Sequence, residues 1–374
     1  MDVGLQLVVE RDNNVSRSNA AVAARQGIVQ DDVIVTPSLT VDIRQPLGRQ
    51  SVFLKGAIGY SFYDKNERLD RERANLQGGV ELGAGPCMVK ATADYLRGQS
   101  ELRDMGLTNT VEKVLETRRI GAEAVCATSG GLGLVAGASQ TWGENSAAQV
   151  VDADSEKRGY RVGVTYARPT LGALTLFGSR EEVDYPNRRL VGGRADGYEL
   201  EAIGVTYSRK LGARIEGEIT AAHTTVEPAA PLSPGTTTGT DFEGATYSAL
   251  LAYRASSRLR FQAEFSRAVS PTLAVGRQYE VQTGYRVSGD YDIGSRFRFS
   301  LGVAQNESEA DGTSSALANV LTNSTTKAVY GALRYQQSRR LGFTLNARHE
   351  ERDANASEFD FSAESVGVTA NVTF

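Results

Sequence analysis

The chain ends in a stretch that decides its fold, Val366-Gly367-Val368-Thr369-Ala370-Asn371-Val372-Thr373-Phe374. Apolar residues alternate with glycine and polar residues along the whole stretch. Successive side chains of a β-strand point to opposite faces, so this strand has one apolar and one polar face. The aromatic ring of Phe374 closes the apolar face. The stretch therefore predicts a strand that separates an apolar environment from a wet one.

The same alternation recurs upstream. Residues 213–220 read Ala-Arg-Ile-Glu-Gly-Glu-Ile-Thr, and residues 259–266 read Leu-Arg-Phe-Gln-Ala-Glu-Phe-Ser. A half-buried strand of a soluble sandwich has this period too, so a single strand decides little. The choice between a soluble sandwich and a transmembrane barrel therefore depends on how often the pattern repeats.

A repeat is visible from residue 164 onward. Residues 164–168 (Val-Thr-Tyr-Ala-Arg) lead to Leu171-Gly172, and residues 205–209 (Val-Thr-Tyr-Ser-Arg) lead to Leu211-Gly212. Weaker copies surround Tyr253, Tyr285 and Tyr335. The spacing of about 40 residues fits two strands, one short turn and one longer loop of a transmembrane barrel.

The expected connections alternate in length. Tight ones fall at residues 45–49, 129–131 and 291–295, and longer polar ones at 15–30, 228–240 and 309–325. This asymmetry predicts short periplasmic turns and longer extracellular loops. We expect an all-β, antiparallel up-and-down transmembrane barrel of about 18 strands, with 16 as the main competitor. No linker divides the chain, so residues 1–374 are expected to form a single domain.

Composition excludes several classes of protein. No run of about 18 apolar residues exists, which excludes a helical membrane protein. The 41 basic and 45 acidic residues give a formal charge of -4, without the basic footprint of a nucleic-acid-binding protein. No leader segment precedes Asp2, so we expect that an export signal is missing and that the sequence begins at the mature protein.

Charged residues occupy the polar side of the alternation. A charge that faces the bilayer midplane costs about 2 to 4 kcal/mol for Arg or Lys, so these side chains should point into the lumen. They are either simply the wetted face of the barrel or a ladder for an acidic or hydroxyl-rich solute. The residues expected to line the lumen are Arg44, Lys55, Arg73, Glu81, Lys90, Asp94, Arg119, Glu123, Arg161, Arg214, Glu216, Glu218, Arg260, Glu264, Arg286, Arg298, Arg334 and Arg348.

Tyrosines and cysteines give two further expectations. Five tyrosines on the apolar side, just before the expected short turns, predict an interfacial aromatic girdle: Tyr166, Tyr207, Tyr253, Tyr285 and Tyr335. Cys87 and Cys126 are the only cysteines, and a thiol pair in the periplasm tends to be oxidised. Their midpoint falls near Met105 and Gly106, so a hairpin with its tip there brings them face to face and predicts a disulfide.

Catalysis and metal binding are not expected. His349 follows apolar residues on the lipid side, as a membrane hydrolase requires, but no Gly-x-Ser-x-Gly elbow, His-Glu-x-x-His pattern or phosphate loop accompanies it. Glu216 and Glu218 share one face because they lie two apart on a strand, so pairing with nearby arginines explains them. Two cysteines and two distant histidines are too few for a metal site. We therefore expect no enzyme, cofactor or metal.

The repeat, the terminal Phe374, residues 8–15 (Val-Val-Glu-Arg-Asp-Asn-Asn-Val) and residues 34–39 (Ile-Val-Thr-Pro-Ser-Leu) together resemble the putative β-barrel porin 2 family. Members include barrels of exopolysaccharide operons. The resemblance covers essentially the whole chain. It implies an outer-membrane conduit for polysaccharide with periplasmic export components as partners, and it supplies no catalytic residues. A terminal Phe374 also resembles the signature that the barrel-insertion machinery reads.

Two classes of function remain. The first is an outer-membrane channel, either a conduit that exports a polysaccharide or another hydrated anionic solute, or a general diffusion porin. The second is a barrel enzyme that acts on lipids, or a structural anchor. About 18 strands leave an aqueous interior, whereas about eight are packed shut, so size favours transport. Outer-membrane lipid and lipopolysaccharide are the expected surroundings.

Overall fold

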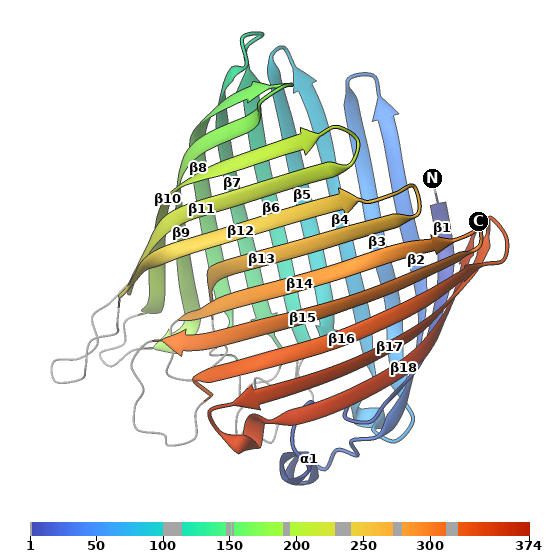
Figure 1. The fold of residues 1–374 in the computed structure, drawn as a ribbon. Helices are drawn as coiled ribbons and strands as arrows, with labels where there is room; N and C mark the ends of the chain where they lie inside the picture. The colour runs from blue at the N-terminus through green and yellow to red at the C-terminus, as the bar shows by residue number, and fades with distance from the viewer. Residues whose placement is uncertain are drawn as a thin grey trace.

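The computed structural model describes residues 2–99, 114–146, 151, 153–189, 195–228, 241–271, 279–311 and 321–374. Eighteen antiparallel strands form one sheet, and β1 pairs with both β2 and β18, so the sheet closes on itself (Figure 1). The prediction of an 18-stranded antiparallel barrel is confirmed. Among the described residues, no helix is both long and apolar enough to cross a membrane.

The strands follow one another around the barrel in chain order, so each pairs with its sequence neighbours. A helix, α1 (Ala20–Gln26), and two 3₁₀ turns, η1 (Glu67–Leu69) and η4 (Ser357–Phe359), lie between strands. The strands are β1 (Asp2–Asp12), β2 (Asp32–Leu47), β3 (Gln50–Tyr63), β4 (Arg71–Ala84), β5 (Cys87–Gln99), β6 (Val114–Ala127), β7 (Leu132–Asn145), β8 (Ser155–Arg168), β9 (Gly172–Arg189), β10 (Ala195–Leu211), β11 (Ile215–Pro228), β12 (Phe242–Arg254), β13 (Leu259–Pro271), β14 (Tyr279–Ile293), β15 (Phe297–Asp311), β16 (Asn323–Gln336), β17 (Leu341–Ala354) and β18 (Phe361–Thr373).

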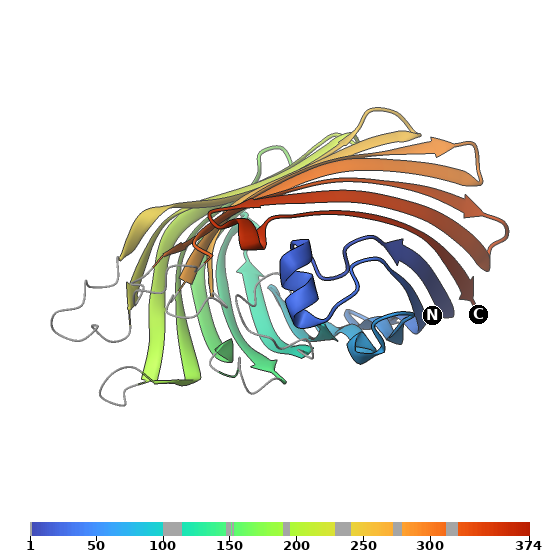
Figure 2. The same ribbon diagram turned by 90° about the horizontal axis from the view of Figure 1, so that it is seen from below.

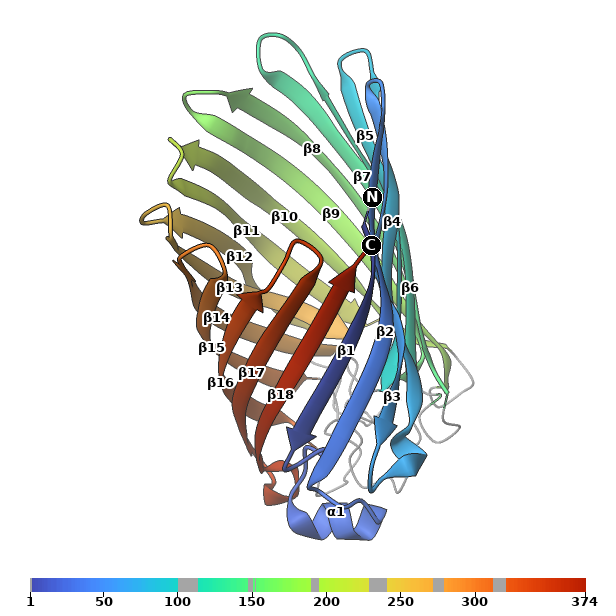
Figure 3. The same ribbon diagram turned by 90° about the vertical axis from the view of Figure 1, so that its right-hand side faces the viewer.

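Connections at the two ends of the barrel differ in length, as the sequence predicts. Tight turns join β2 to β3 and β14 to β15, where Gly48 and Gly294 each adopt a φ of 68° that other residues avoid. Both chain ends lie at this short-turn end (Figure 1). The described connections that carry α1, η1 and η4 lie at the opposite end (Figure 3). In an outer-membrane barrel, the short-turn end faces the periplasm.

One face of the sheet carries a band of apolar side chains around the barrel. We call it the apolar face and define it by the row of Leu345, Val368 and Val9, which lie opposite one another on β17, β18 and β1. These three side chains are 49%, 47% and 41% exposed. Exposure of so many large apolar side chains is typical of a surface that contacts lipid. The other face, which we call the polar face, carries rows such as Gln77, Asp94 and Arg119.

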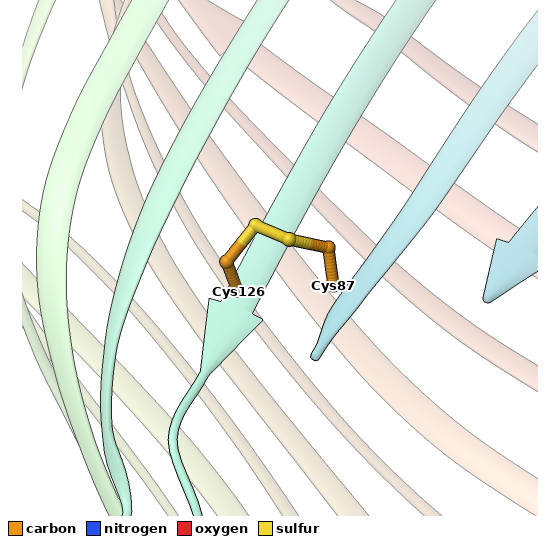
Figure 4. The surroundings of a disulfide bond; sticks show 2 residues. All are labelled: Cys87 and Cys126. Carbon is orange, nitrogen blue, oxygen red and sulfur yellow. A yellow bond between two sulfur atoms is a disulfide. The ribbon is translucent and has the colours of Figure 1, made fainter. Parts of the chain in front are cut away.

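A disulfide joins β5 to β6 near the short-turn end, as predicted (Figure 4). Cys87 lies directly opposite Cys126, their Cα atoms are 3.9 Å apart, and the S–S distance is 2.06 Å. The bond lies on the apolar face, in register with Val89 and Ala124 two residues further along. The predicted hairpin tip at residues 105–106 lies outside the described residues.

Titration of the unfolded, unreduced protein with a thiol reagent should find no free thiol. The double variant Cys87→Ala/Cys126→Ala should fold and lose about 2 to 4 kcal/mol of unfolding free energy, because the bond restricts the unfolded chain. A heat-modifiability gel with and without reductant measures this loss. Two reactive thiols in the unreduced protein would contradict the assignment.

Site-directed spin labels test the two faces. A label at Phe261 on the apolar face should be accessible to oxygen and protected from a polar relaxant, and a label at Arg260 should show the reverse. We expect Phe265, Phe297, Phe299, Val368, Val372 and Phe374 to behave like Phe261, and Arg298 and Arg348 like Arg260. Equal accessibilities at neighbouring positions would refute the alternation.

Candidate functional site

The candidate site is the polar face of the barrel. The register of paired strands puts the predicted lumen residues of β2 to β17 on this one face. Lys90 lies opposite Glu123, for example, and Glu264 opposite Arg286. The alternation therefore gave the correct face for these residues. Whether their side chains contact a solute stays a prediction.

Arg214 is the exception among the predicted lumen residues. It lies in the turn between β10 and β11, where its carbonyl accepts a hydrogen bond from the backbone N–H of Arg254. Gly212 at a φ of 63° starts this turn, and β11 begins only at Ile215. That hydrogen bond continues the register that pairs Ile215 with Tyr253, so Arg214 lies opposite Arg254 just before β11 begins, and its place in the lumen stays a prediction.

The polar face is concave. One hollow of about 630 Å³ joins Asp2 and Gln6 of β1 to Lys55 of β3 and Asp94 of β5. A second, of about 550 Å³, joins Lys90 of β5 to Arg119 of β6 and Arg161 of β8. Each hollow spans several strands, as the inside of a curved sheet does. Since the apolar face meets lipid, this concave face encloses the interior.

Ion pairs divide the polar face into two regions. Along β13 to β15, Arg260 and Arg298 both contact Asp292, at 2.9 and 2.6 Å, and Arg286 lies 3.5 Å from Glu264. Along β2 to β4, Arg44 lies 2.9 Å from Glu81. In these regions, the positive charges are matched by neighbouring carboxylates.

A different arrangement lies along β5, β6 and β8. Lys90, Arg119 and Arg161, which we call the cation cluster, line the same hollow and have no ion pair with any described residue. Asp94, Glu123 and Glu181 line it as well, and Glu181 lies 2.5 Å from Lys157. The cluster therefore offers three cationic groups to whatever fills the hollow.

Two aromatic rings support the cation cluster. The guanidinium of Arg161 lies 3.9 Å from the ring centroid of Phe177, and the Lys90 ammonium lies 5.9 Å from that of Phe53. Arg161 also donates to Thr206 Oγ1 at 3.1 Å. Stacking on a ring holds a guanidinium in place and leaves its edge free to donate hydrogen bonds. Neither ring was predicted from the sequence. Each lies at a strand position where the alternation calls for a polar residue.

The connection between β1 and β2, residues 13–31, is folded and lies across the barrel end opposite the short turns (Figures 2 and 3). We call it the β1–β2 segment. Its centre is the ion pair between the partly buried Arg17 and the buried Asp12, at 2.6 Å, and Arg17 also lies 3.9 Å from Glu350 of β17. Burial lowers the pKa of Arg17, but hydrogen bonds and charge attraction from Asp12 outweigh it and hold the pKa above its ordinary value. Arg17 therefore stays charged.

Hydrogen bonds fasten this segment to both neighbouring connections. Asn14 donates to the carbonyl of Ser362 at 3.0 Å and Asn19 to that of Ser357 at 2.9 Å. On the other side, Asn66 donates to Asp32 at 2.6 Å and to the carbonyl of Val29 at 2.8 Å. Such a connected network of buried polar groups fixes one conformation when its members are satisfied.

A buried aromatic cluster lies at the same end of the barrel. The ring of Tyr198 on β10 lies 6.5 Å from Tyr185 on β9 and 6.0 Å from Tyr279 on β14, which in turn lies 6.5 Å from Phe242 on β12. The strands β10 and β14 are not neighbours in the sheet, so the tyrosines meet across the barrel end. The ring contacts therefore hold β9, β10, β12 and β14 together at this end.

Four of the five tyrosines of the predicted girdle lie where the prediction requires, and the girdle itself stays a prediction. Tyr166, Tyr207, Tyr253 and Tyr335 lie on the apolar face within a few residues of short turns. Tyr285 is on that face too, but β14 continues to Ile293, so the ring lies far from the turn. Tyr291 takes the girdle position on β14 and is 44% exposed. The weak repeat around Tyr285 misled the alignment.

His349 lies on the apolar face of β17. Its Nδ1 atom lies 3.6 Å from a carboxylate oxygen of Glu364, the residue opposite it on β18. Among the described residues, no serine or threonine hydroxyl is hydrogen-bonded to this histidine. A nucleophile activated by His349 is therefore missing from the described part of the chain.

Part of the chain matches a known protein family. A family described as "Putative beta-barrel porin 2" matches residues 192–374, so the motifs at residues 8–15 and 34–39 lie outside the match and the resemblance is narrower than predicted. No curated protein matches the sequence.

Solved structures match the whole chain. The Pseudomonas aeruginosa protein OccK2 (OpdF) matches with a TM-score of 0.50 and 13% identity over 100% of this chain and 98% of its own. A BenF-like porin from Pseudomonas fluorescens Pf-5 gives 0.49 and 12% over the same shares. The likeness to OccK2 concerns the fold. The chain thus has the fold of an outer-membrane β-barrel, and its residues 192–374 match the putative β-barrel porin 2 family.

Proposed function

We propose that the barrel is a water-filled channel for a hydrated, anionic solute, and that an acidic polysaccharide on its way out of the cell is the cargo. The cation cluster of Lys90, Arg119 and Arg161 carries this proposal, because these three groups line one hollow and have no ion-pair partner among the described residues. The sequence resemblance to exopolysaccharide-operon barrels supports the polysaccharide. The cation cluster alone supports only the negative charge of the cargo.

The chemistry of the cluster suits repeated weak contacts. Guanidinium groups match carboxylates in geometry and also donate to sugar hydroxyls. A single tight site would trap a passing chain, whereas several exchangeable contacts let it move. Asp94, Glu123 and Glu181 share the hollow and weaken its attraction for anions, which keeps release fast.

A general diffusion porin is the second candidate. The matched charges along β13 to β15 favour it, since an ion-paired wall discriminates little among small solutes. The two candidates differ in their response to solute charge. An export conduit prefers acidic chains, and a general porin sorts by size.

Two further roles have less support. A lipid-modifying enzyme needs a nucleophile near His349, and the described residues provide none in hydrogen-bond contact with it. A purely structural role as an anchor does not require a concave face with cations that lack ion-pair partners. We include periplasmic export components and the barrel-insertion machinery as partners in the proposal, the latter through Phe374, which is 68% exposed at the chain end.

The β1–β2 segment adds a gate to this proposal. It covers part of the extracellular opening and is fastened by the Arg17–Asp12 ion pair (Figure 2). A long polymer passes only if this segment opens or leaves enough room beside it. Control of the opening therefore resides in the contacts of Arg17, Asn14 and Asn66.

The cation cluster is tested by current block in a planar bilayer. An acidic oligosaccharide should block the native channel, and Arg119→Gln/Arg161→Gln should shorten the block about tenfold, because charge-assisted hydrogen bonds are lost. Arg260→Gln/Arg298→Gln is the matched control: it removes two arginines from the ion-paired region and should change the block less.

A neutral oligosaccharide of equal length completes this test. An open channel that treats acidic and neutral chains alike, in native and variant protein, would leave the general porin as the better description. A channel that stays closed in every condition would defeat the transport proposal altogether.

The gate is tested by Arg17→Ala. Loss of one partner of a buried ion pair costs about 3 to 5 kcal/mol, so the β1–β2 segment should loosen and single-channel conductance should rise. Added protease should also cut within residues 15–30 of the variant. Arg25→Ala is the control, since Arg25 lies on the same segment in an exposed pair with Glu358 at 3.7 Å, worth about 1 kcal/mol or less. Equal conductance and equal protection in both variants would contradict the gate.

A further inference from the structure

The apolar face carries a groove that the transport proposal does not use. A hollow of about 430 Å³ lies on the outside of β14 to β17, the strands in the foreground of Figure 1. Val287, Val303 and Val329 line it, together with Gln305, Lys327 and His349. A site that combines apolar and polar groups on the lipid-facing side of a barrel is a candidate for a specific lipid.

The strand register shows how the groove is built. Val287, Val303, Val329 and His349 lie opposite one another in one row across the four strands. The next row toward the long connections is Tyr285, Gln305, Lys327 and Glu351. Small β-branched side chains thus form a shallow floor below a polar row.

This groove lies where the apolar band ends. One row closer to the short turns are Gly289, Leu301 and Gly331, and one row beyond the polar row are Thr283, Glu307 and Thr325. The apolar floor therefore continues into the bilayer, and the polar row continues toward the extracellular side. A molecule that fills the groove has an apolar part directed inward and a polar part directed outward.

Some polar and charged groups near this row have a partner, and Lys327 does not. Gln305 donates to Glu307 at 2.8 Å, and His349 lies 3.6 Å from Glu364. Lys327 is exposed and has no ion pair with any described residue, although Glu351 lies opposite it. An ammonium at the edge of an apolar band attracts an anionic lipid headgroup.

We propose that this groove binds a phosphorylated glycolipid of the outer leaflet, with its phosphate at Lys327 and an acyl chain over Val287, Val303 and Val329. The Gln305 side-chain carbonyl and the Glu351 carboxylate accept hydrogen bonds from sugar hydroxyls, which a plain phosphate lipid lacks. The groove holds one phosphate and the adjoining part of one chain, and the remaining chains of the lipid lie against the barrel beside it.

The purified barrel in detergent tests this proposal by native mass spectrometry, with diphosphoryl lipid A as the probe. Lys327→Gln should weaken lipid A binding about fivefold. Val303→Trp fills the floor and should remove the specifically bound lipid. Lys210→Gln is the matched control, because Lys210 lies on the polar face in a pair with Glu216 at 2.9 Å, and it should bind lipid A as the native protein does.

Two other lipids test which part of the ligand the groove recognises. Dephosphorylated lipid A should bind the native protein as weakly as lipid A binds Lys327→Gln, and phosphatidylglycerol should bind more weakly than lipid A. Native affinity in both groove variants, with folding verified by heat-modifiability, would overturn the site. Phosphatidylglycerol that binds as tightly as lipid A would overturn its assignment to a glycolipid. The readout is lipid binding, so the result does not depend on whether the barrel conducts.

Discussion

The pairing of β1 with β18 is the constraint on which the rest of the structure depends. No water reaches the bilayer core, so every backbone N–H and C=O group there needs a partner within the protein. The ladder from Gly4–Thr373 to Asp12–Ser365 removes the two free edges of the sheet. An even number of strands in chain order then puts both chain ends on one side. Closure also creates the two faces, one in lipid and one around an interior.

The sequence revealed these two faces because alternation is a local property. A strand of about a dozen residues repeats the pattern several times, and one face must be apolar wherever the other is wet. The strand count, the short-turn asymmetry and the Cys87–Cys126 pairing followed from the same reasoning. One error arose at a strand end. Tyr285 lies far from the short turn because β14 continues to Ile293, and a short repeat does not encode the length of a strand.

Charge pairing in the interior could not be predicted from the sequence. Alternation assigns Arg119 and Arg298 to the same face, but only the distances between strands show that Arg298 meets Asp292 while Arg119 meets no described carboxylate. The same holds for Arg17, whose partners Asp12 and Glu350 lie at opposite ends of the chain. A pattern that defines a wet face therefore leaves open where on that face a solute finds an unoccupied charge.

The position of the disulfide has a consequence for how the barrel is assembled. Cys87 and Cys126 bracket the whole of β5, β6 and the sequence between them. Oxidation in the periplasm before insertion turns this hairpin into a covalent ring. The insertion machinery must then pass a closed loop through the membrane instead of a single strand at a time. In return, β5 and β6 arrive already in register, since a slip by even two residues would separate the sulfur atoms.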